Sequence, residues 1–541
     1  MVTSKIAPYN GVPTLFVNGV PLPGMAYITY FTEKNRYDDF AAAGVKLFSL
    51  PVFFSEQPLN EHGRTPKFAD GIFENGEHFE IMDREMERLL QAAPNALVFP
   101  RLNCALPRAW ELANPDELCD HAVHTVDGVA RHRACFSSDA WAKETERLMT
   151  RFINYVSTQP YADHIIGYQI AGGNTEEWFS FDQRGSIGKR SREKFAKAVA
   201  HGDYTDCEAD YYRYLSAIVA QRIDRLAALT KELTNHRLVV GAFYGYTYEA
   251  PERRSCHHDM NTLLDSPNVD FYCSPMSYSY CRPLSEDQPN MTAVDSIKQR
   301  GKLYFSENDT RTDLSKAPWN LPNYIKPIWF GPDRAASVEM IKKHFARALL
   351  HGHAMWWFDM WGGWYDAPEY KVLFPELEKL AEEALLRPRA SAAKVAVFVD
   401  ERALCQTEEP ALQPHFRRNL GLSGATYDCY LVDDFAAVAS RYRLCIFCVP
   451  AETERMTEAI RSCQCEKVIL SGDNFEDWEK STAEWRTLFR NAGVPVRTEG
   501  DAVVYENESY LYIGAQGDIS PVYDGELEQI WDGFSKLYRK K

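Results

Sequence analysis

The chain has 541 residues, which is too long for one compact domain and indicates about two or three. Hydrophobic residues make up 45% of it and charged residues 25%, the balance of an ordinary globular protein in water. The formal net charge of −16 argues against nucleic acid or an anionic membrane as a partner, because basic surfaces bind both. No apolar run approaches the roughly 20 residues of a membrane helix.

The first residues of the chain show no apolar stretch typical of a secretory signal, so we predict a cytoplasmic location, with an already removed leader as the alternative. The 13 cysteines are odd in number and spread along the chain, unlike a disulfide framework. Cys445 and Cys448 lie in a predicted strand, where residues i and i+3 point to opposite faces, so we expect buried thiols. Cys463 with Cys465, and the Cys256-His257-His258 run, are too isolated to predict a metal site, and we expect no cofactor.

Short apolar runs alternate with helical periodicity over the first 390 or so residues. The runs lack polar alternation, which is typical of strands buried on both faces. Apolar stripes over 79–90, 211–226 and 338–349 predict helices between them. This pattern predicts an α/β fold, a (β/α)8 TIM barrel over residues 1–388. The predicted strands cover 24–30, 45–51, 96–103, 165–170, 238–245, 269–274, 302–307 and 354–359.

An Asn18-Gly19 turn inside 14–22 predicts a hairpin that closes the bottom of the barrel. From residue 389 a second α/β pattern predicts a flavodoxin-like domain over 389–495, with a helix over 452–462. No glycine-rich loop follows its first strand, so we predict an assembly role instead of a nucleotide site. The candidate apolar contacts for another subunit are Leu404, Phe416 and Leu420. Residues 496–541 are expected to form a small C-terminal segment that ends in a helix over 527–538. The strands predicted after residue 389 cover 394–399, 427–431, 444–449, 467–471, 502–505 and 509–513.

Carboxylates follow the fourth and seventh predicted strands of the barrel. Glu177 lies in the loop after the fourth, and Glu307 ends the seventh. Both positions face the mouth of a TIM barrel, where active sites lie. A carboxyl pair there suits retaining glycoside hydrolysis, so we predict Glu177 as acid/base and Glu307 as nucleophile. Glu176 stays open as the acid and Asp309 as the nucleophile.

Aromatic residues make up 13% of the chain, and many stand near predicted strand ends. Indole faces pack against the C–H groups of sugars, so the composition favours a carbohydrate substrate. Tyr246, Asp359 and Trp364 are expected at the same mouth. The residues predicted to bind the substrate are Arg101, Asn103, Asn174, Trp178, Tyr244, Tyr272, Tyr278, Trp356, Trp357 and Trp361.

These features resemble the clan A retaining glycoside hydrolases, whose acid/base and nucleophile glutamates end strands four and seven of a (β/α)8 barrel. The basic segment 128–138 with Cys135, followed by a helix and by 164–170, is similar to glycoside hydrolase family 42, the β-galactosidases. Two features depart from that family. Glu176 stands where it has asparagine, and Cys135 lacks the neighbours of its zinc cluster.

Because of these departures, a sister family such as the family 164 β-mannosidases fits as readily. The resemblance implies a retaining exo-β-glycosidase that acts on small glycosides, with β-galactoside as the first expectation and β-mannoside as the alternative. The second domain resembles the trimerisation domain of family 42, which implies a homotrimer. It also implies that Asn174 contacts the 2-hydroxyl of the sugar in place of the missing asparagine.

Two functions of other classes stay open on the sequence alone. One is a non-catalytic, sugar-binding barrel, which turnover of aryl β-glycosides would exclude. The other is a metal-dependent barrel hydrolase that uses His257 and His258, which insensitivity to a chelator would exclude. The identity of the sugar depends on loops that the sequence does not place.

Overall fold

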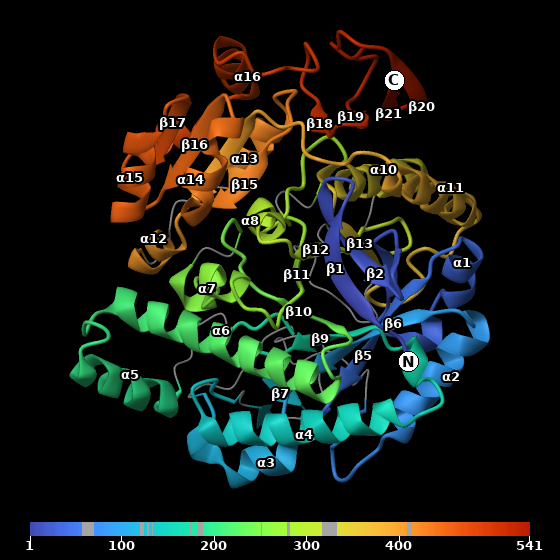
Figure 1. Ribbon diagram of the computed structural model, residues 1–541, viewed down its shortest axis with the longest axis vertical. Helices are drawn as coiled ribbons and strands as arrows, with labels where there is room; N and C mark the ends of the chain where they lie inside the picture. The colour runs from blue at the N-terminus through green and yellow to red at the C-terminus, as the bar shows by residue number, and fades with distance from the viewer. Residues whose placement is uncertain are drawn as a thin grey trace.

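A closed barrel of eight parallel strands forms the centre of the molecule (Figure 1). The computed structural model describes the chain except residues 57–69, 120–123, 127–128, 132–133, 174–175, 181–187, 250–251, 279–281, 316–332 and 408–413. Each barrel strand overlaps its predicted range, so the TIM barrel is confirmed. In chain order the strands are β4 (Met25–Ile28), β5 (Leu47–Phe53), β6 (Leu97–Asn103), β9 (Gly167–Ala171), β10 (Val239–Phe243), β11 (Phe271–Pro275), β12 (Leu303–Asn308) and β13 (Ala354–Phe358).

Amphipathic helices pack around the barrel and bury their apolar stripes against it (Figure 1). The three predicted stripes lie in α2 (Glu80–Ala92), α6 (Glu208–Leu233) and α10 (Arg334–His351). The other helices of this region are α1 (Tyr37–Ala42), α3 (Arg108–Ala113), α4 (Asp139–Ser157), α5 (Lys189–His201), α7 (Met260–Leu264), α8 (Val294–Gln299) and α11 (Pro368–Leu385). A short ribbon of β7 (His124–Val126) and β8 (Val129–Arg131) lies between α3 and α4 in the chain.

Side chains along each barrel strand alternate between the inside of the barrel and the helix layer. Phe99, Phe271 and Phe305 come from three different strands, yet their ring centroids lie 5.3–5.8 Å apart, so they fill the interior. Trp356 stacks on Phe305 at 4.7 Å and therefore also points inward. On the same strand, residues an odd number of positions from one of these interior residues point outward, and residues an even number away point inward. We call this alternation the parity of a residue, and it decides which strand-end residues reach the mouth.

The amino-terminal end of the barrel is covered by a three-stranded sheet of β1 (Ser4–Tyr9), β2 (Val12–Val17) and β3 (Val20–Pro21). Asn18 and Gly19 have φ of +50° and +81°, which suits the predicted hairpin turn. The Ser4 hydroxyl donates to the Ile166 carbonyl and accepts from the N–H of Val239, the first residue of β10. The predicted closure of the barrel bottom is therefore confirmed, with one strand more than the sequence indicated.

The second α/β region contains a parallel sheet in the order β15-β14-β16-β17. This is the order of the first four strands of a flavodoxin-like sheet. The edge strand β15 is covered by barrel helix α8, because the N–H of Cys429 donates to Asp295 and that of Leu431 to the Ser296 hydroxyl. Its elements are β14 (Val395–Val399), α12 (Glu401–Gln406), α13 (Pro414–Gly421), β15 (Asp428–Leu431), α14 (Phe435–Val438), β16 (Leu444–Val449), α15 (Glu454–Ser462), β17 (Glu466–Ser471) and α16 (Thr482–Asn491).

The last part of the chain is a four-stranded antiparallel sheet, not two strands and a helix. Its strands are β18 (Val503–Glu506), β19 (Tyr510–Gly514), β20 (Leu527–Trp531) and β21 (Ser535–Lys540). The helix predicted over 527–538 is therefore wrong. Asp532-Gly533, with Gly533 at φ +109°, interrupts that stretch and turns it back as a hairpin. The hairpin packs on α10, where the N–H of Ser535 donates to Glu339 at 2.8 Å.

Two surface properties bear on partners. The sequence suggested Leu404, Phe416 and Leu420 as apolar contacts for another subunit, but their exposed fractions are 0%, 1% and 0%, so they belong to the core of this chain.

Among the described residues, none of the helices combines the length and the apolar character needed to span a bilayer.

Candidate active site

The loop after β9, the fourth barrel strand, makes a tight turn that carries two glutamates. The N–H of Trp178 donates to the Gly172 carbonyl at 2.7 Å, and the N–H of Gly172 donates to the Glu176 carbonyl at 3.3 Å. Gly173, Glu176 and Trp178 have φ of +71°, +72° and +63°. Left-handed backbone at a tryptophan is costly and persists only where neighbouring contacts enforce it, which is common at functional sites.

Trp178 supplies that enforcement by anchoring the loop in the core. Its side chain is fully buried, its indole N–H donates to the Ile170 carbonyl at 3.0 Å, and its ring packs on Phe136 and Trp141. A Cβ on Gly173 would come within 2.5 Å of the Phe179 carbonyl oxygen, so only glycine fits that turn. The prediction that Trp178 binds substrate is corrected: it holds the glutamate loop from below.

Glu176 and Glu177 meet different partners at the mouth. Tyr30, two residues beyond β4, donates its hydroxyl to Glu176 at 3.0 Å, and Arg101 lies 3.8 Å from the same carboxylate. Tyr246, in the loop after β10, donates its hydroxyl to Glu177 at 2.7 Å. Glu176 is buried, whereas Glu177 is partly exposed. The two neighbouring carboxylates therefore contact different groups, Glu176 the hydroxyl of Tyr30 with Arg101 nearby, and Glu177 the hydroxyl of Tyr246.

Glu307 is the last residue but one of β12, the seventh barrel strand, and points inward as its parity requires. Arg101 donates to its Oε2 at 3.0 Å, and the indole N–H of Trp356 approaches the same oxygen at 3.4 Å. Burial raises the pKa of Glu307 to about 7, although the ion pair with Arg101 acts in the opposite direction. A buried carboxylate at the mouth is thus held by a cation and an indole.

Arg101 connects the carboxylates of the two strand ends. It leaves β6 toward the mouth and also donates to Gln169 at 3.0 Å and to the Tyr30 hydroxyl at 3.2 Å. Its guanidinium lies 4.9 Å from the ring centroid of Phe243 and 5.3 Å from that of Trp356. Aromatic faces and hydrogen bonds on all sides fix the guanidinium plane. Glu176 and Glu307 therefore share one rigid cation.

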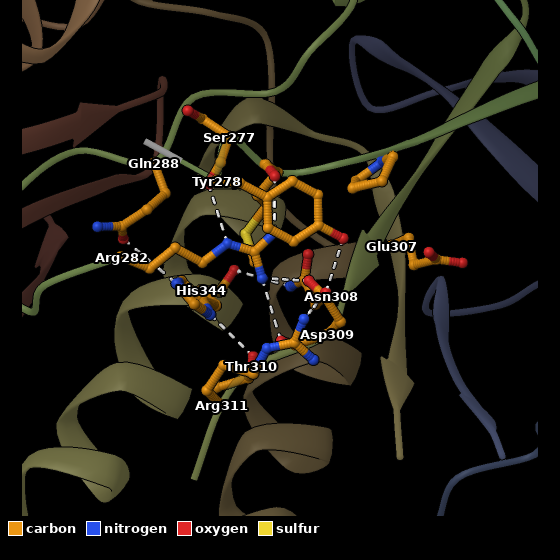
Figure 2. Close-up of polar contacts among 12 residues, drawn as sticks. Ser277, Tyr278, Arg282, Gln288, Glu307, Asn308, Asp309, Thr310, Arg311 and His344 are labelled. Carbon is orange, nitrogen blue, oxygen red and sulfur yellow. Dashed lines mark hydrogen bonds and ion pairs between the residues drawn. The ribbon is translucent and has the colours of Figure 1, made fainter. Parts of the chain in front are cut away.

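A second buried ion-pair network lies beside the nucleophile candidate. Asp309 accepts from the hydroxyl of Tyr278 at 2.9 Å and pairs with Arg311 at 2.8 Å and with Arg282 (Figure 2). Glu307 points away from this network (Figure 2). Two guanidinium groups and a tyrosine hydroxyl hold the Asp309 carboxylate in place. Asp309 is therefore a poor alternative to Glu307 as nucleophile, and its position supports the loop after β12.

Three further aromatic residues predicted to bind substrate face the helix layer instead. The Tyr244 hydroxyl donates to the carbonyls of Ser216 and Cys256, and the Tyr272 hydroxyl donates to that of Leu263. Trp357 packs on Phe374 of α11 at 5.1 Å. These predictions are wrong because each residue has the outward parity of its strand.

The remaining predicted residues divide into mouth and core. Asn103 has inward parity, and its Oδ1 accepts from the N–H of Ala105 at 3.1 Å. Trp361, 3% exposed, packs edge-on against Trp364 at 5.3 Å in the loop after β13. Asp359 accepts from the Tyr27 hydroxyl and caps the same loop through the N–H of Trp364. Asn174 lies outside the described residues.

His257 supports the loop after β10 and is not placed as a metal ligand. Its Nδ1 accepts from the N–H of Gly245 at 3.1 Å, so the ring proton sits on Nε2. Burial lowers the pKa of His257 to about 3, and the ring stacks between Phe179 and Tyr244. A neutral histidine here orders the chain just before Tyr246. Within the described part of the chain, neither His257 nor His258 belongs to a group with metal-ligand geometry.

Sequence reasoning missed several members of the site. Tyr30, Gln169, Phe243 and Phe358 all contact Arg101. The signal that could have found them is parity, because each lies an even number of residues from an interior position on its own strand. A cavity of about 320 Å³ adjoins the mouth, and its lining includes Tyr30, Phe53 and Arg84.

Solved structures show the same fold, although no protein-family model and no curated protein sequence matches the chain. The β-galactosidase of the psychrophilic Marinomonas ef1 has a TM-score of 0.60 at 13% identity, covering 96% of this chain and 100% of that one. The β-galactosidase of Bacillus circulans sp. alkalophilus gives 0.61 at 13%, covering 96% and 99%. Gan42B, a GH42 β-galactosidase of G. stearothermophilus, gives 0.59 at 11%, covering 100% of both chains. The resemblance in fold that the sequence predicted is confirmed over the whole length.

Proposed function

We propose that this protein is a glycoside hydrolase that cleaves terminal β-linked sugars by a retaining, two-glutamate mechanism. The observation that carries the proposal is the convergence of Glu307 and the Glu176-Glu177 pair on one barrel mouth, where Arg101 contacts both Glu307 and Glu176, and Tyr246 contacts Glu177. Carboxyl groups at the ends of strands four and seven are what this chemistry requires. The fold shared with β-galactosidases supports the same class of reaction.

Glu307 is the proposed nucleophile. Its carboxylate attacks the anomeric carbon, and a covalent glycosyl-enzyme forms as the leaving oxygen departs. Arg101 aligns the carboxyl group of Glu307 and lowers its pKa against the opposing effect of burial. Trp356 and Phe305 form the floor below it and keep water from the buried side.

Glu177 is the proposed acid/base. A general acid must be held at the mouth where the leaving oxygen departs, and the hydroxyl that Tyr246 donates to Glu177 fixes the position of its carboxyl group. Glu176 instead lies 3.8 Å from Arg101, the same cation that contacts the proposed nucleophile. The partly exposed position of Glu177 also suits a leaving group that departs toward solvent. Glu176 then stands where the resembling family has asparagine, and we expect its carboxyl group to bind a sugar hydroxyl.

The test is turnover of a panel of aryl β-glycosides, followed by trapping with the matching 2-fluoro glycoside and peptide mapping. Label on Glu307 supports the assignment, and label on Asp309 or Glu176 refutes it. Azide should restore activity to Glu177→Ala and give a β-glycosyl azide, because the small anion attacks the anomeric carbon of the glycosyl-enzyme directly, releases Glu307 and needs no general base. Glu176→Ala serves as the matched control and should show no rescue. No turnover on any glycoside would favour the non-catalytic sugar-binding alternative.

The expected substrate is a small β-galactoside, with β-mannosides as the alternative. The Glu176 carboxyl group beside Arg101 supports recognition of a hydroxyl near the anomeric carbon, and it is the residue that separates this mouth from the family 42 pattern. Ranking kcat/KM across galactosides, mannosides and glucosides decides between them. A preference for mannosides would favour the resemblance to the family 164 β-mannosidases.

We also propose that the protein assembles as a homotrimer through its second α/β region and works in the cytoplasm. A domain without a phosphate loop beside a complete barrel is expected to serve assembly, although the apolar residues first suggested for the contact are buried. Light scattering at micromolar concentration tests the assembly, because a mass near 61.9 kDa would show a single chain.

A further inference from the structure

Three cysteine side chains meet in the second α/β region, far from the barrel mouth in the chain. Cys445 is the second residue of β16, Cys463 directly follows α15, and Cys465 precedes β17. The Sγ of Cys445 lies 3.3 Å from that of Cys465, and the Sγ of Cys463 lies 3.5 Å from it. All three sulfur atoms lie within 4.8 Å of one another. The sequence showed only a Cys-x-Cys pair, because the third cysteine comes from the neighbouring strand.

The local fold brings the three thiols together. Strand β16 pairs in parallel with β17, and α15 makes the crossover between them. Cys445, Phe447 and Val449 share the face of β16 that packs against α15, whereas Cys448 belongs to the opposite face. The N–H of Cys463 donates to the Ala459 carbonyl at 3.0 Å, which fixes the end of the helix over Cys445. The chain therefore returns to β17 with Cys465 between the other two sulfurs.

We propose that Cys445, Cys463 and Cys465 bind a thiophilic d¹⁰ metal ion, zinc first, through three thiolates. Zinc–sulfur bonds of about 2.3 Å in tetrahedral geometry place sulfur atoms about 3.8 Å apart. The observed separations of 3.3 Å, 3.5 Å and at most 4.8 Å bracket that value, so small side-chain movements suffice. Within the described residues this is the one group of histidine, cysteine and carboxylate side chains with such geometry.

The surroundings suit three thiolates with a fourth position for water. Cys445 and Cys463 are buried, and Cys465 is partly exposed, which gives the ion a route to solvent. Lys467, the register partner of Cys445, donates to the Ile460 carbonyl and so places a cation on the α15 side of the sheet. Binding replaces three S–H protons, which pass to solvent, by three zinc–sulfur bonds, and no electron is transferred.

The consequence is a structural clamp between α15 and the β16–β17 pair. This strand pair forms one edge of the sheet, so the ion would fix an element that otherwise packs through a small apolar cluster. The site is separate from the proposed glycosidase chemistry, and its failure would leave that proposal unchanged.

The test uses the full-length protein, purified under reducing conditions and freed of metal by a chelator. Titration with Zn²⁺ or Co²⁺ should reach one equivalent per chain, with thiolate-to-cobalt charge-transfer absorption and release of protons. Cys463→Ser and Cys465→Ser should lose the bound metal and the cobalt spectrum. Cys465 is partly exposed, so its variant tests binding even where replacement of buried Cys445 impairs folding.

Two control variants test whether cysteines outside the group contribute to metal binding. Cys207→Ser removes an exposed thiol outside the group, and Cys448→Ala removes a buried thiol from the opposite face of the same strand. Both should bind one equivalent, as the unaltered protein does. The proposal fails where the unaltered protein shows no thiolate-to-cobalt absorption, or where Cys463→Ser retains it. It also fails where reagent titration under denaturing, non-reducing conditions finds two thiols fewer than the 13 present and mapping places a Cys445–Cys465 disulfide.

Discussion

Replacing Arg101 by methionine should move the acid limb of the pH–activity profile upward. Arg101 is the cation that opposes the burial of Glu307, whose pKa lies at about 7 with the ion pair in place. Methionine keeps much of the volume and apolar character of the arginine stem but removes the charge. The buried carboxylate then holds its proton to higher pH, and a protonated carboxyl is no nucleophile.

The size of the effect follows from the contact. An opposite charge at hydrogen-bond distance lowers a carboxyl pKa by about 1–3 units. Its removal raises the pKa of Glu307 to roughly 8–10, so activity at pH 7 falls about 5- to 500-fold and recovers as the pH rises. Arg101→Lys keeps the charge but loses the planar fork, so its shift should be smaller.

The assay is kcat/KM for an activated aryl glycoside from about pH 5 to 10, because this parameter reports the pKa values of the free enzyme. The unaltered protein should show an acid limb near the pKa of Glu307, about 7. A variant that loses activity equally at every pH, with its acid limb unmoved, would refute the argument. Arg101 would then position groups without setting the charge of Glu307.

The pH dependence of the free energy of unfolding tests the Arg101–Glu307 ion pair independently. The pKa of Glu307 is higher in the folded state than its ordinary 4.5, so its contribution to folding is present below 4.5 and is lost as the pH rises through 7. In Arg101→Met the loss should continue to higher pH, because the charge stays buried without a partner. Urea unfolding at several pH values measures this, and adding Glu307→Gln should remove the pH dependence.

Three other changes test how the mouth is supported. Tyr246→Phe removes the hydroxyl that stabilises charged Glu177, so the pKa of Glu177 should rise and the basic limb should move up, which a pH profile of kcat/KM measures. Gly173→Ala should lower both Tm and kcat because the added methyl clashes with backbone, whereas Gly202→Ala, at φ +93° with open space around it, should lower Tm alone. Arg417→Met should lower kcat with little change in KM, because Arg417 of the second α/β region donates to a backbone carbonyl of the loop after β10. An unchanged kcat would show that this region does not affect catalysis.

Much of the architecture could be read from local patterns. Buried parallel strands are continuous apolar runs, and helices between them show period 3.6, so the eight strands and the sheet order of a (β/α)8 barrel followed from the sequence. The Asn18-Gly19 turn predicted the hairpin for the same local reason. The C-terminal stretch 527–538 shows the limit, since the same apolar residues fit a helix or a hairpin until packing on α10 selects the hairpin.

The candidate carboxylates could also be named from the sequence, because strand ends in a barrel face one mouth and Glu177 and Glu307 follow strands four and seven. Which aromatic residues reach that mouth was decided only by the register and parity of the closed barrel, which turn Tyr244, Tyr272 and Trp357 outward and Trp356 inward. The bridge from Arg101 to Glu307 and the meeting of Cys445 with Cys465 join residues far apart or on separate elements. The pattern of residues along the chain does not predict such contacts, because they form only when distant segments pack together.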